Sequence, residues 1–544
     1  MVGLGVRSLG ESMNYILLVG LVCACRLTGQ PSPGTGSIEG RVLNSLTSAP
    51  VRKTSVNLSA ARVWLLAETD AEGRFQFTAL PAGNYKLSAT RSGFIDQQMR
   101  RLIVVGQDAH VTDVGIRLRP LSTLSGRVLD EDGDPADGAS INIFKQIYRN
   151  GIRQWDQLNS TAVTNDSGEY RFPGLAPGRY LVEARHLRPM TNNHYGDRDS
   201  LGKPMMTYVP AYYPNSASEQ TASAIEIGLG SDVRDIDIHL YKSPLFHVRG
   251  KVVGASPNSQ TQIGVSLRPA YGAATSGGGE SAYASPPDYT FDASVIPAQY
   301  KISAIQGYAD TPEGFATDTV TVAGNVSGVV LTMGPATEVT ALVSLAEAGS
   351  RVNLQGVKVY LHNLGAGMNG LGGGFGIPSE ATGRLSFAKP TFPGHYSVWA
   401  EGSSLPAGIY LKAVKLGGQE IPVGDFESVS SAEIEFVFST KAGAISGSVV
   451  SEDGKPIPDA RATLLPADGN SGFAAQSTDD TGKFKFTSLR PGKYKLLAWE
   501  EVEDGLWQDP EFCKKFGTHA KDVTIGPNET QDVQLSIVAL EEMK

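Results

Sequence analysis

The chain has 544 residues, of which 41% are apolar and 19% are charged, and its formal net charge is −9. The length exceeds what one hydrophobic core supports, and the apolar content is too high for a disordered chain. The acidic balance, with no basic stripe along the sequence, argues against nucleic acid as a partner.

The N-terminus predicts export. Residues 15–25 (YILLVGLVCAC) form an apolar run that suits a signal peptide but is too short for a stable membrane anchor. The run ends in Val-Cys-Ala-Cys, which resembles a bacterial lipobox with Cys25 as the lipidated residue. Lipidation of Cys25 and simple secretion stay as alternatives, with contact to a membrane only through such an anchor. We expect a signal at 1–25, a linker at 26–36 and a periplasmic, extracellular or outer-membrane lipoprotein location.

Once the signal is removed, Cys513 is the one cysteine left in the sequence. No intramolecular disulfide can then form, so we expect the hydrophobic cores to stabilise the protein. No histidine stands in the local segment around Cys513, and we expect an ordinary side chain rather than a reactive thiol.

One phrase recurs along the rest of the chain. A turn glycine precedes aromatic residues two positions apart, and a Pro/Gly turn then precedes a tyrosine with an alanine four residues later. Clear copies lie at 73–89, 168–184 and 482–498, and looser copies lie at 288–304 and 383–400. Because side chains alternate along a strand, Phe75 and Phe77 share one face, as do Tyr85, Leu87 and Ala89. The phrase therefore predicts a hairpin with one apolar face, which needs further strands behind it.

Other short strands surround each hairpin. A Gly-x-Val type of strand opens four units at 39–43, 125–133, 249–253 and 446–454, with a weaker one at 340–345. Alternating runs such as 235–240 and 532–538 close them. About seven strands per unit predict an all-β fold, a tandem array of about five antiparallel β-sandwiches of prealbumin or immunoglobulin type, with little helix. The predicted units are 37–120, 121–243, 244–335, 336–441 and 442–544.

The sequence offers few patterns that carry catalysis or metal binding. Its eight histidines are scattered without metal-ligand spacing, and no nucleophile elbow or phosphate-binding loop occurs. The G-x-G-x-x-G at 365–370 lacks the helix that a dinucleotide site needs, so we interpret it as a glycine-rich loop. The D-x-D-x-D at 130–134 lacks the glycine and glutamate of a calcium loop, and a turn is the simpler reading. We predict no enzyme activity, no catalytic residue, no cofactor and no metal.

The repeated unit resembles the carboxypeptidase regulatory-like domain. The resemblance is clear at 37–119, 124–240 and 444–538 and degenerate at 246–333 and 337–438. It implies a prealbumin-like sandwich, grouped with carbohydrate-binding-like folds, and an accessory or binding role in an exported protein. In carboxypeptidases this domain accompanies a separate zinc catalytic domain, which nothing in this sequence resembles.

Two long insertions between late strands carry aromatic residues that the repeat does not need. The first contains Tyr208, Tyr212 and Tyr213, and the second contains Trp507. Loops on a sandwich scaffold often carry function, so we assign these four residues to ligand binding. The alternative is that they pack against a sandwich or a neighbouring unit. An isopeptide cross-link between a lysine and an asparagine or aspartate needs a buried acid beside it. Glu183 and Glu500 lie near where such an acid could fall, but the opening strands of their units offer no lysine.

These observations favour a non-catalytic, exported, multidomain protein that binds carbohydrate or an envelope polymer. The alternative is a structural or adhesive stalk with a protein partner. An exposed aromatic platform would favour carbohydrate binding, and tight junctions without such a platform would favour the stalk.

Overall fold

The computed structural model describes residues 35–543, except for 61–62, 100–101, 150, 187–204, 256–261, 271–279, 309–310, 336–339, 348, 350–351, 355, 364–372, 377–382, 388–393, 402–404, 422–424, 429–432, 470–471 and 504. The predicted signal, the candidate lipidation residue Cys25 and the glycine-rich loop at 365–370 lie outside the described residues.

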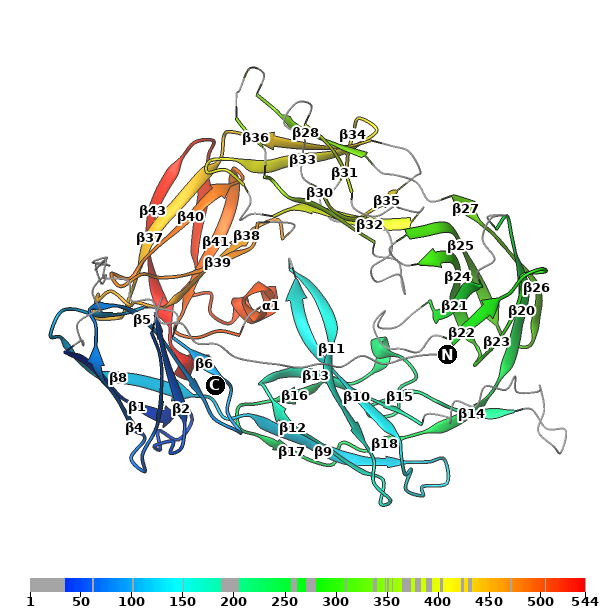
Figure 1. Cartoon of the computed structure of the whole chain (residues 1–544), viewed down its shortest axis with the longest axis horizontal. Coiled ribbons are helices and arrows are strands. Elements are labelled where there is room, and N and C mark those ends of the chain that lie inside the picture. Colours follow the sequence, from blue (N-terminus) through cyan, green and yellow to red (C-terminus); the bar gives the residue numbers. More distant parts are fainter. Residues whose placement is uncertain are drawn as a thin grey trace, which may run out of the picture.

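The regular secondary structure of the described chain is almost all β-strand, and it forms five β-sandwiches in sequence order, as the repeat predicts. Each has its own buried apolar cluster, and these span 38–118, 124–240, 248–331, 341–438 and 445–535. We number them sandwiches 1 to 5. Figure 1 shows them following one another around a ring, which brings sandwich 5 (orange to red) back beside sandwiches 1 and 2 (blue to cyan). The exact unit boundaries given above stay a prediction.

Sandwich 1 has the sheets β4-β1-β8 and β3-β2-β5-β6, and β7 also pairs with β5. Its strands are β1 (Gly36–Asn44), β2 (Ser55–Ala60), β3 (Val63–Glu68), β4 (Arg74–Leu80), β5 (Gly83–Thr90), β6 (Gln97–Gln98), β7 (Ile103–Val105) and β8 (His110–Leu118).

Sandwich 2 has the sheets β12-β9-β17 and β11-β10-β13-β15, with β18 on β9, β16 on β13 and a separate pair β14-β19. Its elements are β9 (Ser122–Leu129), β10 (Ser140–Arg149), β11 (Ile152–Val163), β12 (Glu169–Leu175), β13 (Gly178–Arg185), β14 (Met206–Val209), β15 (Ala211–Tyr212), η1 (Glu219–Thr221), β16 (Ile225–Ile227), β17 (Asp232–Val233), β18 (Ile238–His239) and β19 (Tyr241–Pro244).

Sandwich 3 has the sheets β23-β20-β26 and β22-β21-β24-β25-β27. Its strands are β20 (Phe246–Val253), β21 (Ile263–Pro269), β22 (Glu280–Ala284), β23 (Thr290–Val295), β24 (Ala298–Tyr308), β25 (Thr311–Val322), β26 (Val326–Thr332) and β27 (Gly334–Pro335).

Sandwich 4 has the sheets β31-β28-β36-β33-β34 and β30-β29-β32-β35. Its strands are β28 (Thr340–Leu345), β29 (Val359–Asn363), β30 (Gly373–Gly376), β31 (Arg384–Ser386), β32 (Gly394–Ala400), β33 (Tyr410–Leu416), β34 (Gln419–Ile421), β35 (Asp425–Ser428) and β36 (Ile434–Ser439).

The strands of sandwich 5 form one continuous hydrogen-bonded order, β39-β38-β41-β43-β37-β40, and β42 also pairs with β41. Its elements are β37 (Gly443–Val450), β38 (Arg461–Pro466), β39 (Ala474–Ser477), β40 (Lys483–Leu489), β41 (Gly492–Trp499), η3 (Leu506–Gln508), α1 (Pro510–Lys514), β42 (Lys521–Ile525), β43 (Thr530–Val538) and η4 (Leu540–Met543). Within the described chain, no helix is long and apolar enough to cross a bilayer.

The five sandwiches share one pairing rule. The opening strand pairs antiparallel with the strand that carries the repeated phenylalanine and parallel with a closing strand, as β37 does with β40 and β43. The predicted hairpin is wrong, because the strand with the repeated phenylalanine and the strand with the tyrosine pair with other strands and not with each other. In sandwich 1, for example, β4 pairs with β1 while β5 pairs with β2 in the other sheet, so the Pro/Gly turn carries the chain from one sheet to the other. Both pairings of the opening strand join residues far apart in the sequence, and local alternation could not predict them.

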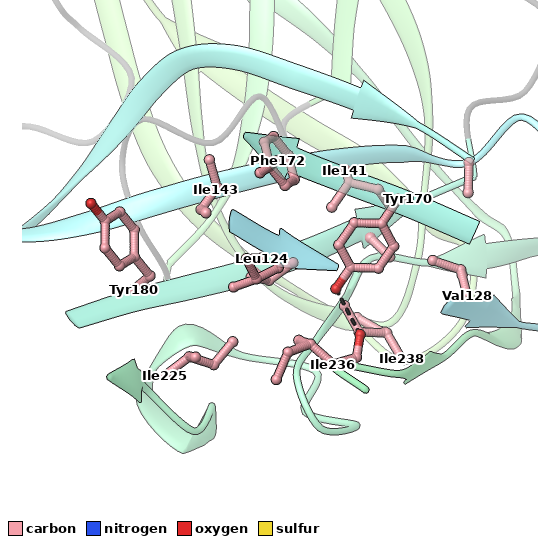
Figure 2. Close-up of a cluster of buried hydrophobic side chains, with 14 of the residues drawn as sticks. Leu124, Val128, Ile141, Ile143, Tyr170, Phe172, Tyr180, Ile225, Ile236 and Ile238 are labelled. Atoms are coloured by element: carbon pink, nitrogen blue, oxygen red, sulfur yellow. Dashed lines mark hydrogen bonds between the residues drawn. The ribbon is translucent and has the colours of Figure 1, made fainter. Parts of the chain in front are cut away.

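The residues of the repeat build the cores. Figure 2 shows this for sandwich 2, where Tyr170 packs among Leu124, Ile141 and Ile238 and its hydroxyl donates to the Ile236 carbonyl at 2.7 Å. A second hydrogen bond recurs in four of the sandwiches, at the tyrosine near the start of the later strand of the repeated phrase. The hydroxyls of Tyr85, Tyr180, Tyr300 and Tyr494 each donate to the carbonyl four residues earlier, at 2.6–2.9 Å. These tyrosines are buried, as predicted.

Candidate functional site

The three tyrosines predicted to bind a ligand lie against sandwich 2. Tyr212, on β15, is 5% exposed and packs on Phe144 with ring centroids 6.3 Å apart. Tyr208 and Tyr213 are half-buried against the core of the sandwich. Lys242 Nζ lies 4.8 Å from the centre of the Tyr208 ring. The burial of Tyr212 supports the packing alternative, because its ring offers no open face to a sugar, while a binding role for Tyr208 and Tyr213 stays a prediction.

Trp507 belongs to a small second core in sandwich 5. It lies on η3 and is 5% exposed, in one cluster with Leu497, Trp499 and Phe516. The insertion that carries Trp507 thus covers the outer face of β41, whose inner face lines the main core. This burial supports the packing alternative for Trp507, because the apolar surface of β41 needs a cover, and a binding role for Trp507 stays a prediction.

A different pair of aromatic residues lies on an outer sheet face in sandwich 4. Tyr360 on β29 and Trp399 on β32 are cross-strand partners, with ring planes 5° apart and centroids at 5.2 Å. Their neighbours Val359 and Val398 are buried, so alternation turns both rings outward, and Trp399 is 38% exposed. Figure 1 shows the sheet that contains β32 on the side of sandwich 4 toward the centre of the ring.

Charged side chains lie beside this pair. The Tyr360 hydroxyl donates to Glu401 Oε2 at 3.3 Å, and Lys358 Nζ lies 3.5 Å from the same oxygen. A flat aromatic surface with a carboxylate and an ammonium group next to it provides both stacking and hydrogen bonding. This is the chemistry that a sugar ring, with its apolar faces and equatorial hydroxyls, requires.

The sequence analysis missed this pair, although a signal for it exists. Trp399 occupies the position before the alanine of the repeat, where the other copies have Ser88, Glu183, Ser303 and Leu497. A comparison of outward positions between the copies would have singled out the tryptophan. The aromatic residues in the insertions, which were predicted to bind a ligand, are buried or half-buried against the sandwiches instead.

The remaining candidates prove to have structural partners. Asp130 accepts the backbone N–H groups of Asp132 and Asp134, both at 3.0 Å, which is turn chemistry. Among the described residues no cluster of three His, Cys, Asp or Glu side chains could hold a metal ion. Cys513 is buried, and burial, aided by Asp509, raises its pKa to about 12, so the thiol is a poor nucleophile.

Glu183 is buried as an ion pair. Its carboxylate takes two hydrogen bonds from Arg185, at 2.8 and 2.9 Å, and one from Asn142 at 3.0 Å. The cation that contacts Glu183 is an arginine and not a lysine, so these contacts fit an ordinary buried ion pair.

Taken together, the fold defines a protein of tandem β-sandwiches with outward aromatic residues on one sheet. The carboxypeptidase regulatory-like domain family matches residues 37–119, 123–192 and 444–538. The chain therefore contains carboxypeptidase regulatory-like domains in these three regions, which confirms the resemblance found in the sequence.

Two staphylococcal proteins are similar to part of the chain. The serine-aspartate repeat-containing protein D of Staphylococcus aureus strain Newman is 29% identical over 144 residues, covering 21% of this chain and 10% of that protein. The serine-aspartate repeat-containing protein E of strain Mu50 is 25% identical over 169 residues, covering 28% of this chain and 15% of that protein. The chain thus matches only a small part of the length of these curated relatives.

Solved structures with similar folds include a minor pilin of Streptococcus agalactiae and a putative carbohydrate binding protein of Bacteroides uniformis. The pilin has 15% identity and a TM-score of 0.22, covering 39% of this chain and 97% of its own. The Bacteroides protein has 9% identity and a TM-score of 0.15, covering 36% of this chain and 100% of its own. Such low TM-scores carry no argument about the function of this chain.

Proposed function

We propose that this chain is an exported, non-catalytic protein of the cell envelope that binds a glycan or envelope polymer through the outer face of sandwich 4. The observation that carries the proposal is the parallel pair Tyr360 and Trp399, with Glu401 and Lys358 beside it. Aromatic surface flanked by a few polar groups is the usual composition of a site for an organic ligand.

The proposed location in the cell envelope rests on the sequence. The N-terminal apolar run supports export, and Cys25 is the residue that would carry a lipid anchor. The match to segments of two serine-aspartate repeat-containing proteins is consistent with a bacterial envelope protein.

A glycan-array screen of the mature chain, followed by calorimetry on the best neutral oligosaccharide, tests the site. We expect Trp399→Ala to weaken binding about 5- to 150-fold, since loss of one stacking surface costs about 1–3 kcal/mol, here by analogy with base stacking. The melting temperature should stay nearly unchanged because Trp399 is 38% exposed.

Trp64→Ala is the matched control, because Trp64 is 70% exposed on β3 of sandwich 1. It should bind like the wild type. Equal losses in both variants, or wild-type affinity in Trp399→Ala, would contradict the assignment to sandwich 4.

A second candidate function is a structural or adhesive protein with a protein partner. The observation in its favour is that sandwich 5 is held against sandwiches 1 and 2 by ion pairs, including Arg119 with Glu501 at 2.9 Å. A mature chain that binds no glycan on the array but captures a defined surface protein would favour this candidate.

A further inference from the structure

Sandwiches 1 and 3 have open grooves at equivalent places in the fold. Groove 3, of about 960 Å³, lies between the opening strand β20 and the edge strand β22, with Gly250, Phe291 and Val329 along it. Groove 1, of about 640 Å³, lies between β1 and β3, and Gly40 and Phe75 take the corresponding positions. The shared fold thus produces the groove, while the side chains at its rim differ.

Groove 3 carries a positive rim. Arg249 and Lys251 project from β20, and Asp292 is the one acidic residue that lines it among the described residues. Both oxygens of Asp292 are engaged, one by His247 Nδ1 at 2.6 Å and the other by Arg249 Nε at 2.9 Å. Burial opposes this charge, but the hydrogen bonds from His247 and Arg249 outweigh it and hold the pKa of the Asp292 carboxyl below its usual value. The charge of Asp292 is therefore already balanced within the protein.

Lys251 adds a positive charge beyond this balanced pair. Its side chain is exposed and makes no ion pair with any described residue. A solvated ammonium group at the rim of a groove attracts anions locally, against the repulsion from a protein whose net charge is −9.

The equivalent groove in sandwich 1 shows that the fold does not impose this charge. Groove 1 is lined by four acidic residues and two arginines, namely Glu39, Glu68, Asp70, Asp113, Arg41 and Arg74. The side chains that line groove 1 therefore carry a net negative charge. The cationic rim of groove 3 is therefore not imposed by the repeat.

An exposed aromatic ring lies on the opposite wall of groove 3. Tyr283, on the edge strand β22, is 66% exposed, while Ala282 and Ala284 on either side of it are buried. A large apolar ring held in solvent beside a lysine and an arginine gives a stacking surface next to cationic groups.

We propose that groove 3 binds an acidic glycan, with a sugar ring stacked on Tyr283 and a carboxylate paired with Lys251, while Arg249 lies beside Lys251 on the same strand. This inference rests on the proposed carbohydrate function and adds a second site, distinct from Tyr360 and Trp399, with an anionic ligand class. An acidic peptide would satisfy the two cations but does not need a flat stacking surface, so the glycan is the better match.

Calorimetry with oligogalacturonate, a chain of carboxylated sugars, tests the proposal on the full mature chain. The wild type should bind, and the affinity should fall as sodium chloride is raised. Lys251→Glu should weaken binding at least about tenfold, because an attractive charge becomes a repulsive one. Tyr283→Ala should also weaken it, and Arg41→Glu, the matched change in groove 1, should not.

Two further measurements separate this site from the one on sandwich 4. Trp399→Ala should leave oligogalacturonate binding intact, and Lys251→Glu should leave neutral glycan binding intact. Wild-type affinity in Lys251→Glu, or equally tight binding of polyglutamate in place of oligogalacturonate, would overturn the acidic-glycan assignment. If neutral glycans fail to bind while oligogalacturonate binding depends on Lys251, the sandwich 4 proposal fails and the groove proposal stands.

Discussion

Single glycines allow the opening strand and a closing strand to approach one another in four of the five sandwiches. A Cβ on Gly447 would lie 2.2 Å from the Val533 carbonyl oxygen and 2.7 Å from the Phe484 ring. Gly40 and Gly250 meet the same two kinds of neighbour in sandwiches 1 and 3. The glycine of the Gly-x-Val strand is thus required by the close approach of the parallel partner strand.

Gly447→Ala should therefore destabilise sandwich 5. The added methyl group must displace backbone as well as an aromatic edge, and overpacking of this kind costs about 1–3 kcal/mol. Differential scanning calorimetry of the full chain should show a lower melting transition. Ser448→Ala, on the next residue of β37, is the control and should change the transition little.

The buried tyrosines make the protein sensitive to alkaline pH. Burial raises the pKa of Tyr494 from 10.0 to about 12, and the neighbouring Asp468 adds to this effect. In the unfolded chain the phenol loses its proton near its ordinary pKa, whereas in the folded chain it keeps the proton to higher pH. The free energy of unfolding should therefore fall as the pH rises from about 10 toward 12 and should be unaffected by this group below that range.

Urea unfolding midpoints of the wild type and of Tyr494→Phe, measured at neutral pH and at about pH 11, check the alkaline effect. The variant should lose less stability than the wild type between these two conditions. At neutral pH it should be slightly less stable, because it lacks the hydrogen bond to the Arg490 carbonyl, worth about 1 kcal/mol. If both proteins lose the same stability between neutral pH and about pH 11, the ionisation of Tyr494 is not the cause of the loss.

At the scale of elements, insertions act as covers for the outer faces of sheets. In sandwich 5 the segment with η3 and α1 places Trp507 and Phe516 over Leu497 and Trp499. In sandwich 2 Tyr212 covers Phe144 and Leu181 in the same way. Leu181 on β13, and Leu497 and Trp499 on β41, are apolar outer positions for this reason, although the repeat alone would allow polar residues there.

Trp507→Ala should lower the free energy of unfolding of sandwich 5 by about 3–5 kcal/mol, the range for removal of a large buried aromatic side chain. The calorimetric transition of sandwich 5 is the measurement. Lys514→Ala, on the exposed side of α1, is the control and should be close to neutral. A stable Trp507→Ala variant with a specific loss of glycan binding would instead restore the original interpretation of this residue.

The sequence predicts elements well where the signal is local. Period-two alternation places Phe75, Tyr85 and their equivalents in the cores, because a strand with one buried face must alternate. The role of Trp507 could not be predicted this way, since an aromatic residue in an insertion is equally consistent with a cover and with a platform. Trp399 was predictable only from a comparison of outward positions across the copies.

At the scale of the whole molecule, sandwich 5 closes the ring on sandwich 2. The backbone N–H of Gly151, in the β10–β11 turn, donates to Gln508 Oε1 at 3.0 Å, and Lys145 forms an ion pair with Glu503. Burial and the neighbouring Asp509 raise the pKa of Tyr148, on β10, to about 12. We call these the closing contacts. Local patterns could not predict them, because each joins residues in different repeats.

A substitution at Gly151 tests the closing contacts directly. Its φ is 75°, and a Cβ there would lie 2.6 Å from the Phe473 ring of sandwich 5. Gly138 has a similar φ of 71°, but a Cβ on it would meet no atom within 4 Å. Gly151→Ala and Gly138→Ala therefore impose similar backbone strain on sandwich 2, and only the first also pushes sandwich 5 away. Small-angle X-ray scattering should show a larger radius of gyration for Gly151→Ala and the wild-type value for Gly138→Ala.

The ion pair offers an independent test of ring closure by charge reversal. Lys145→Glu and Glu503→Lys should each place like charges at a half-buried contact and increase the radius of gyration, whereas the double variant should restore the wild-type value. Since these side chains are only partly shielded from solvent, raised salt should weaken the attraction in the wild type and the repulsion in the single variants. Single variants with unchanged dimensions would show that the ring is held by other contacts, or that the sandwiches already move independently in solution. Expanded single variants together with a compact double variant would establish that the second and fifth sandwiches meet through this pair.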